Sequence, residues 1–248
     1  MIILSVGMPR AGSGWHYNLI HDLVVAAGYQ DGREIRRRYH LERILTEVNC
    51  NIGALTTKRL LPVLVPALLG NTFAIKAHSS PTPTALRLMR MGLMRTTYIY
   101  RDPRDAMLSA LEYGQRARAS GHQNAFAQLE TFDDALAFIQ QYLDVWDAWI
   151  NQPGTLCCRY EDLLEDYDRQ MNLLLKFLPL DADHPIDDPK VQAVIEQYRP
   201  EQTRRTDQRG MHFRQGKIGR FREKFSPEEQ YVVNRTFEPF LAQMGYQP

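Results

Sequence analysis

Short apolar runs alternate along the chain with longer segments in which apolar residues recur every three or four positions. The short runs are rich in β-branched and aromatic residues, as buried parallel strands are, and they lie at residues 2–7, 73–76, 96–100 and 155–159. The periodic segments predict helices at residues 15–27, 81–91, 103–119, 132–150 and 161–178. Strands that alternate with helices favour an α/β fold with a doubly wound parallel sheet.

No repeat, low-complexity tract or linker interrupts this order, so we expect a single domain over residues 1–248. Residues 33–70 give a weaker signal. The charged stretch at 33–44 predicts a helix, whereas the apolar stretch Leu60–Gly70 has no clear period and is interrupted by Pro62 and Pro66. It is also too short to cross a bilayer, which predicts no membrane span. It indicates either ordinary core or a hydrophobic binding surface.

Bulk composition narrows the class of partner. The chain has 44% hydrophobic and 24% charged residues, which is ordinary for a globular protein. The net charge of +1 provides no global field for nucleic acid, so any anion site is local. Three cysteines, two of them adjacent, predict neither a disulfide framework nor a metal site. The first apolar run leads directly into a glycine loop, so we expect no signal peptide and a cytoplasmic protein.

The first predicted strand ends in a glycine loop. Gly7 and Gly12 have the G-x-x-x-x-G spacing of a phosphate-binding P-loop, in the strand–loop–helix context that such a loop requires. Ser13 and Gly14 stand where a P-loop has the lysine and Ser/Thr that reach the outer phosphates and hold magnesium. Backbone amides at this helix start would cradle an anion. The alternative is a plain strand-to-helix turn.

Charged residues follow the second and third strands. Lys76 and His78 are two residues apart and leave an extended backbone on the same face, where a cation favours a neutral imidazole. The alternative for His78 is a hydrogen-bonded loop residue. Arg101 ends a strand and Ser109 lies two turns into the next helix, so both could face one crevice. We expect the intervening charges to cap that helix or to pair, and they are Asp102, Arg104 and Asp105.

A late basic segment at residues 212–226 combines cations with two glycines and aromatic residues; the cations relevant here are Arg214, Lys217, Arg220, Arg222 and Lys224. A solvated charge run is one interpretation, and a loop that folds over an anion is the other.

These segments, in this order and together with RYEDLLED at residues 159–166, resemble the sulfotransferases that use 3′-phosphoadenosine 5′-phosphosulfate (PAPS). The resemblance extends from residue 7 to about residue 226. It implies PAPS as co-substrate, 3′,5′-adenosine bisphosphate (PAP) as product, and no metal. It implies His78 as general base, with Lys76 and Arg10 stabilising developing charge. The implied donor-binding positions are Arg10, Ala11, Gly12, Ser13 and Gly14 at the phosphosulfate, Trp15 and Tyr160 at the adenine, and Arg101, Ser109, Arg214, Gln215 and Gly216 at the 3′-phosphate.

The chain departs from that family pattern at several positions. Arg10 stands for a lysine, and Gly14 stands for a threonine, which removes one hydroxyl from the phosphosulfate site. Gln215 stands for a lysine, which predicts a more weakly held 3′-phosphate. The dimer motif of the family is poorly matched, so the oligomeric state stays open.

A sulfuryl group carries less charge than a terminal phosphoryl group, so backbone amides and a few cations can handle it. Phosphoryl transfer relies on magnesium and the P-loop lysine. The leading hypothesis is therefore metal-free transfer to a hydroxyl or amine of a small or lipid-like acceptor, bordered by residues 33–70 and 111–135. The alternatives are a P-loop small-molecule or nucleotide kinase and a nucleotide-binding protein without turnover.

Overall fold

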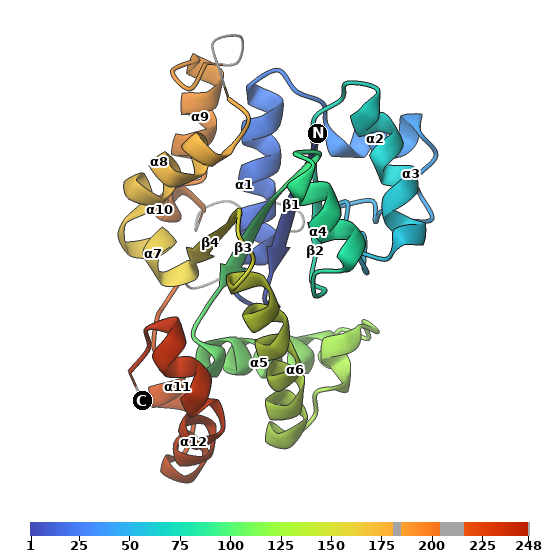
Figure 1. Ribbon diagram of the computed structural model, residues 1–248. Helices are drawn as coiled ribbons and strands as arrows, with labels where there is room; N and C mark the ends of the chain where they lie inside the picture. Colours follow the sequence, from blue (N-terminus) through green and yellow to red (C-terminus); the bar gives the residue numbers. More distant parts are fainter. Residues whose placement is uncertain (181–184, 204–215, 248) are drawn as a thin grey trace.

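The computed structural model describes residues 1–180, 185–203 and 216–247 (Figure 1). Its centre is a four-stranded sheet in the order β2-β1-β3-β4, and every neighbouring pair is parallel. The strands are β1 (Ile2–Gly7), β2 (Phe73–Ala77), β3 (Met94–Tyr100) and β4 (Thr155–Arg159). All four strands predicted from the sequence are confirmed, with ends that differ by no more than two residues.

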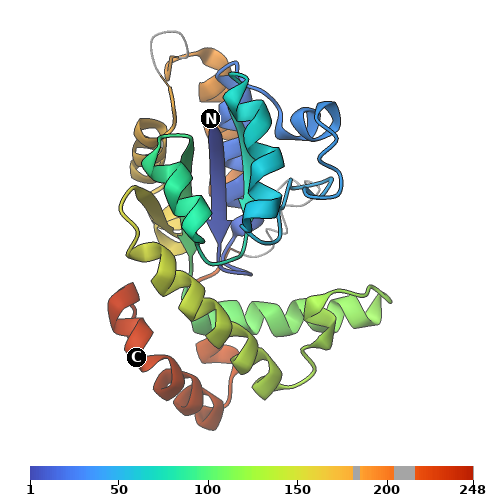
Figure 2. The same ribbon diagram turned by 45° about the vertical axis from the view of Figure 1, so that its right-hand side comes forward.

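Helices surround this sheet and form the second and third layers (Figures 1 and 2). They are α1 (Ser13–Ala26), α2 (Gly32–Arg38), α3 (Thr57–Leu68), α4 (Pro83–Arg90), α5 (Pro103–Ala119), the 3₁₀ helix η1 (Ala125–Gln128), α6 (Phe132–Ile150), α7 (Tyr160–Glu165), α8 (Tyr167–Phe177), α9 (Pro189–Gln197), α10 (Pro200–Thr203), α11 (Phe221–Lys224) and α12 (Pro227–Met244). The chain moves from β1 outward to β2 and then back past β1 to β3. Because parallel crossovers are right-handed, α1 and α4 lie on opposite faces, which confirms the doubly wound fold.

Three expectations about helices need correction, the third of which concerns residues 33–44. The segment with Pro62 and Pro66 is the continuous helix α3. Each proline removes one N–H donor, but the helix buries Leu60, Val63 and Ala67 against the core, and this burial outweighs the lost hydrogen bonds. The predicted helix 161–178 is two helices, because Asp166 leaves helical geometry with φ −137° and ψ 58°.

The charged stretch at 33–44 is helical only as far as Arg38. His40 has φ 53°, a left-handed conformation that a helix cannot continue through. Residues beyond it reach back to the sheet edge, where the backbone of Asn51 forms an isolated parallel bridge with Lys76. Part of the segment 33–70, which gives only a weak signal in the sequence, therefore lies beside the carboxyl end of β2.

The carboxyl ends of the four strands meet at one edge of the sheet. Val6 pairs with Ala77, Gly7 with Ile99, and Tyr100 with Arg159. Every residue of β1 is buried, so the loop that follows it starts from a rigid base. The glycine loop, the Lys76–His78 segment, Arg101 and Tyr160 are therefore brought together by topology.

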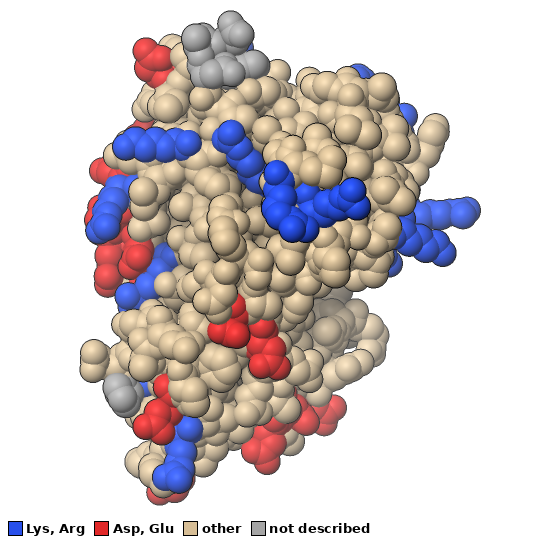
Figure 3. Space-filling model, in the orientation of Figure 1, with Lys and Arg blue, Asp and Glu red and all other residues tan. Residues whose placement is uncertain are grey.

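Charged side chains are unevenly spread over the surface. In the face seen in Figure 3, Asp and Glu lie along one margin and over the lower half. The upper right of that view, where α3 and α4 lie in Figure 1, has Lys and Arg but no visible acid.

Candidate active site

The glycine loop is shaped by two residues with positive φ, Arg10 at 65° and Gly12. Gly12 has φ 77°, and a Cβ there would lie 2.7 Å from Cδ2 of Tyr160, so only glycine fits. Gly12 also caps α1, whose first turn contains no acidic residue. The amides of Gly12, Ser13 and Gly14 have no hydrogen-bond partner among the described residues. A helix start with open amides and no neighbouring carboxylate attracts anions.

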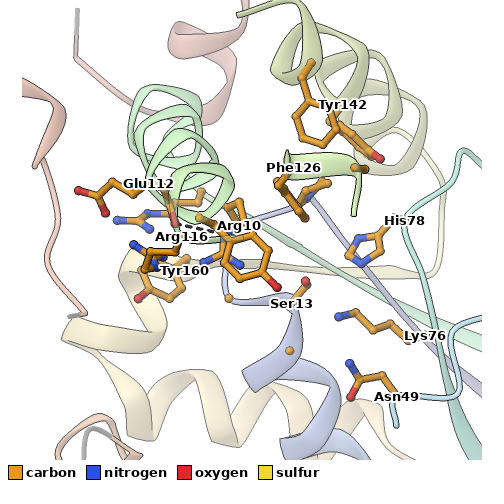
Figure 4. A pocket seen from close by; sticks show the side chains of 18 of the residues that line it. Arg10, Ser13, Asn49, Lys76, His78, Glu112, Arg116, Phe126, Tyr142 and Tyr160 are labelled. Atoms are coloured by element: carbon orange, nitrogen blue, oxygen red, sulfur yellow. Dashed lines mark hydrogen bonds between the residues drawn. The ribbon is translucent and has the colours of Figure 1, made fainter. Parts of the chain in front are cut away.

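A cavity of about 380 Å³ opens over this loop (Figure 4). Ten of the predicted site residues line it: Arg10, Gly12, Ser13, Gly14, Lys76, His78, Arg101, Ser109, Tyr160 and Gly216. Ala11 is fully buried behind the loop. Arg214 and Gln215 lie outside the described residues.

Positive charge dominates the cavity wall. Its described lining includes six basic residues, which are Arg10, Lys76, Arg101, Arg116, Lys217 and Arg220. The one acidic residue in that lining is Glu112, and Arg220 pairs with it through two hydrogen bonds of 3.1 and 2.5 Å. Two of the six, Lys76 and Arg101, are buried, and gathering this many like charges around one cavity is costly unless a ligand of opposite charge enters. The wall is therefore suited to a polyanion.

His78 and Lys76 lie side by side at one end of the cavity (Figure 4). Burial and the Lys76 charge lower the pKa of His78 to about 4, so its imidazole is neutral near pH 7. Nδ1 of His78 lies 2.6 Å from the Gly7 carbonyl oxygen. A carbonyl only accepts, so Nδ1 carries the proton and donates, which leaves the lone pair on Nε2. That tautomer is the one a general base needs.

Lys76 is almost fully buried. Burial, with a smaller contribution from Arg10, lowers the pKa of its ammonium to about 8. The cation effect on His78 that the sequence predicts is therefore present, but burial is the larger cause.

Arg10 links the glycine loop to the opposite wall. Its Nε donates to Oγ of Ser109 at 3.2 Å, and its guanidinium lies 4.5 Å from the centre of the Tyr113 ring. Burial lowers its pKa to about 10. Arg10 thus remains charged at neutral pH and faces a wall of hydroxyl and aromatic groups.

Arg101 is held from two sides. Nη2 donates to Oδ2 of Asp105 at 3.1 Å and to the carbonyl of Lys217 at 2.8 Å, while its Nε is buried and has no partner within the described part of the chain. Asp105 also accepts the amides of Gly219 at 2.7 Å and Phe221 at 3.0 Å. Asp105 therefore fastens the late basic segment to α5, a wider role than the predicted capping.

The other two charges near the start of α5 are structural, as the sequence predicts. Asp102 caps α5 by accepting the amide of Arg104 at 2.9 Å, and the two side chains pair. Arg104 also donates to Oδ1 of Asn234 and to the carbonyl of Gln247, and these hydrogen bonds connect α5 to α12 and to the residues that follow it.

The placement of Trp15 differs from the prediction. Its indole is fully buried, stacks on Tyr167 and donates from Nε1 to the Tyr198 carbonyl at 3.1 Å. It does not line the described cavity, because its ring packs against Tyr160 and Tyr167 and its N–H is bound to Tyr198. Of the two residues expected at the adenine, Tyr160 alone forms part of the wall.

Sequence reasoning missed several lining residues. They come from the segment after α2, from α5, from η1 and from α6, and they are Asn49, Asn51, Tyr113, Arg116, Phe126, Phe138 and Tyr142. No spacing in the sequence marks them, because they meet only through the fold. The apolar stretch 60–69 contributes no residue to this cavity.

Fold and cavity together define an α/β protein with a phosphate-loop type of anion site, in which a neutral histidine and a lysine share one end. The family model described as "Sulfotransferase domain" matches residues 2–245, so the chain belongs to the sulfotransferase family. This confirms the class predicted from the sequence and leaves the kinase alternative without support.

Solved structures give the same fold. Retinol dehydratase with androsterone and the inactive cofactor PAP is 20% identical, with a TM-score of 0.59 over 97% of this chain and 80% of that one. Mouse sulfotransferase SULT7A1 complexed with PAP is 16% identical, with a TM-score of 0.60 over 97% of this chain and 84% of that one. The comparison with curated proteins found no significant match.

Proposed function

We propose that this enzyme transfers a sulfuryl group from PAPS to a hydroxyl or amine of a small-molecule acceptor. The observation that carries the proposal is that one cavity is lined both by an open anion cradle, formed by the first turn of α1, and by a histidine whose lone pair is on Nε2. The presence of PAP in the retinol dehydratase and SULT7A1 structures supports the choice of donor.

The residues present fit such a donor. Amides of Gly12, Ser13 and Gly14 suit the 5′-phosphosulfate, because they are open and meet no carboxylate. Arg101 suits the 3′-phosphate, since its buried Nε lacks a partner among the described residues. Ser109 and Gly216 line the same cavity. Tyr160 suits the adenine.

When bound, the donor supplies an activated sulfuryl group at a phosphate–sulfate anhydride. Nε2 of His78 accepts the proton of the acceptor hydroxyl or amine, an assistance of typically ~10²–10⁴ in rate. Lys76 and Arg10 hold positive charge where negative charge develops. The buried surroundings of Lys76 strengthen its electrostatic effect, because little water screens it.

The acceptor would enter at the His78 end. Phe126 and Tyr142 lie on one side of His78, and Asn49 lies beyond Lys76 on the other (Figure 4). Oδ1 of Asn49 is buried and has no partner among the described residues, so its amide is available to a polar group of the acceptor. This site suits a small molecule with an apolar body and a second hydrogen-bonding group.

Calorimetric titration with PAP tests the donor site. We expect Arg101→Gln to weaken PAP binding by about tenfold or more, since a charge-assisted hydrogen bond to phosphate contributes roughly 1.5–3 kcal/mol. Arg95→Gln is the matched control, because Arg95 lies at the opposite end of β3 and donates to the Phe177 carbonyl. Equal affinity in both variants would refute the placement of the 3′-phosphate. PAP binding without transfer to any acceptor would instead favour a protein without turnover.

A further inference from the structure

Helix α3 exposes an apolar stripe to solvent. Leu61, Val65, Leu68 and Leu69 are 53%, 50%, 62% and 67% exposed. Their spacing of four, three and one residues places them on one side of the helix, opposite the buried Leu60 and Val63 faces. No described residue covers the stripe, and α3 contributes nothing to the cavity. Such a large apolar surface on a helix marks an interaction site.

The same part of the chain contains no acidic residue. Residues 48–101 include seven Lys and Arg and neither Asp nor Glu, although the whole chain has 29 acidic residues and a net charge of +1. Two of those cations, Lys76 and Arg101, line the cavity, and the others lie outside it. The local charge is thus strongly positive in a protein that is nearly neutral.

These two features adjoin one another. Lys58 precedes Leu61 by one turn and lies on the same exposed side of α3. The neighbouring helix α4 starts beside α3, where the hydroxyls of Thr57 and Thr84 are 2.5 Å apart. Arg87, Arg90 and Met91 form the exposed side of α4. Figure 3 shows Lys and Arg but no acid over this part of the molecule.

We propose that this α3–α4 surface docks on an anionic lipid bilayer; we define the surface as Lys58, Leu61, Val65, Leu68, Leu69, Arg87, Arg90 and Met91. An apolar stripe flanked by cations is the pattern of an element that lies in the plane of a membrane interface. The leucines would enter the headgroup region while the arginines meet lipid phosphates. None of the described helices is long and apolar enough to cross a membrane, so the contact is peripheral.

Docking in this way has a consequence for the cavity. Asn49, Asn51, Lys76 and His78 belong to the same acid-free run and line the end of the cavity where we propose that the acceptor enters. The docked surface and that entrance are therefore formed by one continuous stretch of chain. The docking itself does not depend on the proposed chemistry, so the two can fail separately.

Sedimentation with lipid vesicles tests the proposal without donor or acceptor. We expect binding to vesicles of equal phosphatidylglycerol and phosphatidylcholine, at least tenfold weaker binding to phosphatidylcholine alone, and release as ionic strength rises. Arg87→Gln/Arg90→Gln should weaken binding to the anionic vesicles about tenfold or more. Leu68→Gln/Leu69→Gln should weaken it to a similar degree, because it removes the apolar part of the contact.

The matched control is Tyr231→Gln/Val232→Gln, which removes an exposed apolar pair from α12, beside Glu228 and Glu229. This variant should bind vesicles like the wild type. All substituted side chains are exposed, so thermal melts and PAP affinity should stay unchanged and report correct folding. Equal binding to both kinds of vesicle, or full binding by the leucine variant, overturns the proposal. A wild-type dimer in light scattering that becomes monomeric in Leu68→Gln/Leu69→Gln also overturns it, because a second copy would then cover the stripe.

Discussion

His78 owes its proposed role to a single hydrogen bond and to burial. The Gly7 carbonyl fixes the proton on Nδ1, and the buried position keeps the ring neutral. We expect His78→Ala to remain folded and to bind PAP like the wild type, with kcat lowered by ~10²–10⁴. The loss should be smaller for an acidic phenol than for an aliphatic alcohol, because a phenol ionises more readily. Near wild-type kcat in a well-folded variant would falsify the general-base assignment.

The two shifted pKa values at this end of the cavity predict a pH profile. His78 loses its lone pair to a proton below about pH 4, and Lys76 loses its charge above about pH 8 in the free enzyme. We therefore expect kcat/KM to be level between these values and to fall on either side. In kcat the basic limb should move to higher pH, because the bound donor anion raises the pKa of Lys76.

Lys76→Arg provides the control for this profile, since arginine stays charged throughout the range. Its activity is expected to be lower, but the basic limb near pH 8 should disappear. A basic limb that persists unchanged in this variant would assign it to another group.

Single residues at strand ends could be predicted because the topology sends every carboxyl end to one edge. Lys76 lies at the end of β2, His78 and Arg101 follow β2 and β3 directly, and all three line the cavity. Trp15 could not be placed, because whether an aromatic ring packs inward or faces a ligand depends on α9 and its neighbours. Asn49 could not be found at all, since it reaches the cavity only because the chain turns back after α2 and pairs Asn51 with Lys76.

At the scale of elements, the glycine loop requires glycine at position 12 for two separate reasons. Its φ of 77° disfavours other residues, and the Tyr160 ring leaves no room for a Cβ. We expect Gly12→Ala to weaken PAP binding at least tenfold, because the loop must move away from Tyr160 and its amides then lose their common direction. Calorimetry with PAP measures the effect.

Gly70→Ala is the control that separates the effect of backbone strain from the effect of a steric clash. Gly70 has φ 89°, but a Cβ there meets nothing within 4 Å. We expect both variants to lose about 1 kcal/mol of unfolding free energy through backbone strain. Only Gly12→Ala should lose donor affinity. Equal PAP affinity of Gly12→Ala and wild type would contradict the assignment of this loop to the donor.

Elements with a strong period were predictable, and those stabilised by tertiary contacts were not. Helices α5 and α6 have the bounds that their apolar period and flanking prolines, glycines and caps indicate. Helix α3 contains two prolines and forms because one side is buried, which no local rule reports. Helices α7 and α8 share one continuous apolar pattern, but the chain turns at Asp166 between them.

Over the whole molecule, positive charge is concentrated in particular regions although the net charge is close to zero. A net charge of +1 conceals a cavity with six basic residues and an acid-free stretch of 54 residues. The sequence predicted a local anion site, because no global field exists. It could not show that Arg116, Lys217 and Arg220 share the cavity with Arg10, since they lie far apart along the chain.

Transfer of radiolabelled sulfate from PAPS, measured in the presence of EDTA, tests the central claim most directly. Phenols, alcohols, amines, lipids and glycans would be offered as acceptors, with wild type and His78→Ala side by side. We predict labelled product from at least one acceptor class with the wild type, undiminished by EDTA because Gly14 replaces the Ser/Thr that would hold magnesium. His78→Ala should form little. Activity that EDTA abolishes and magnesium restores, or phosphate transfer from ATP in place of sulfate transfer from PAPS, would contradict the account.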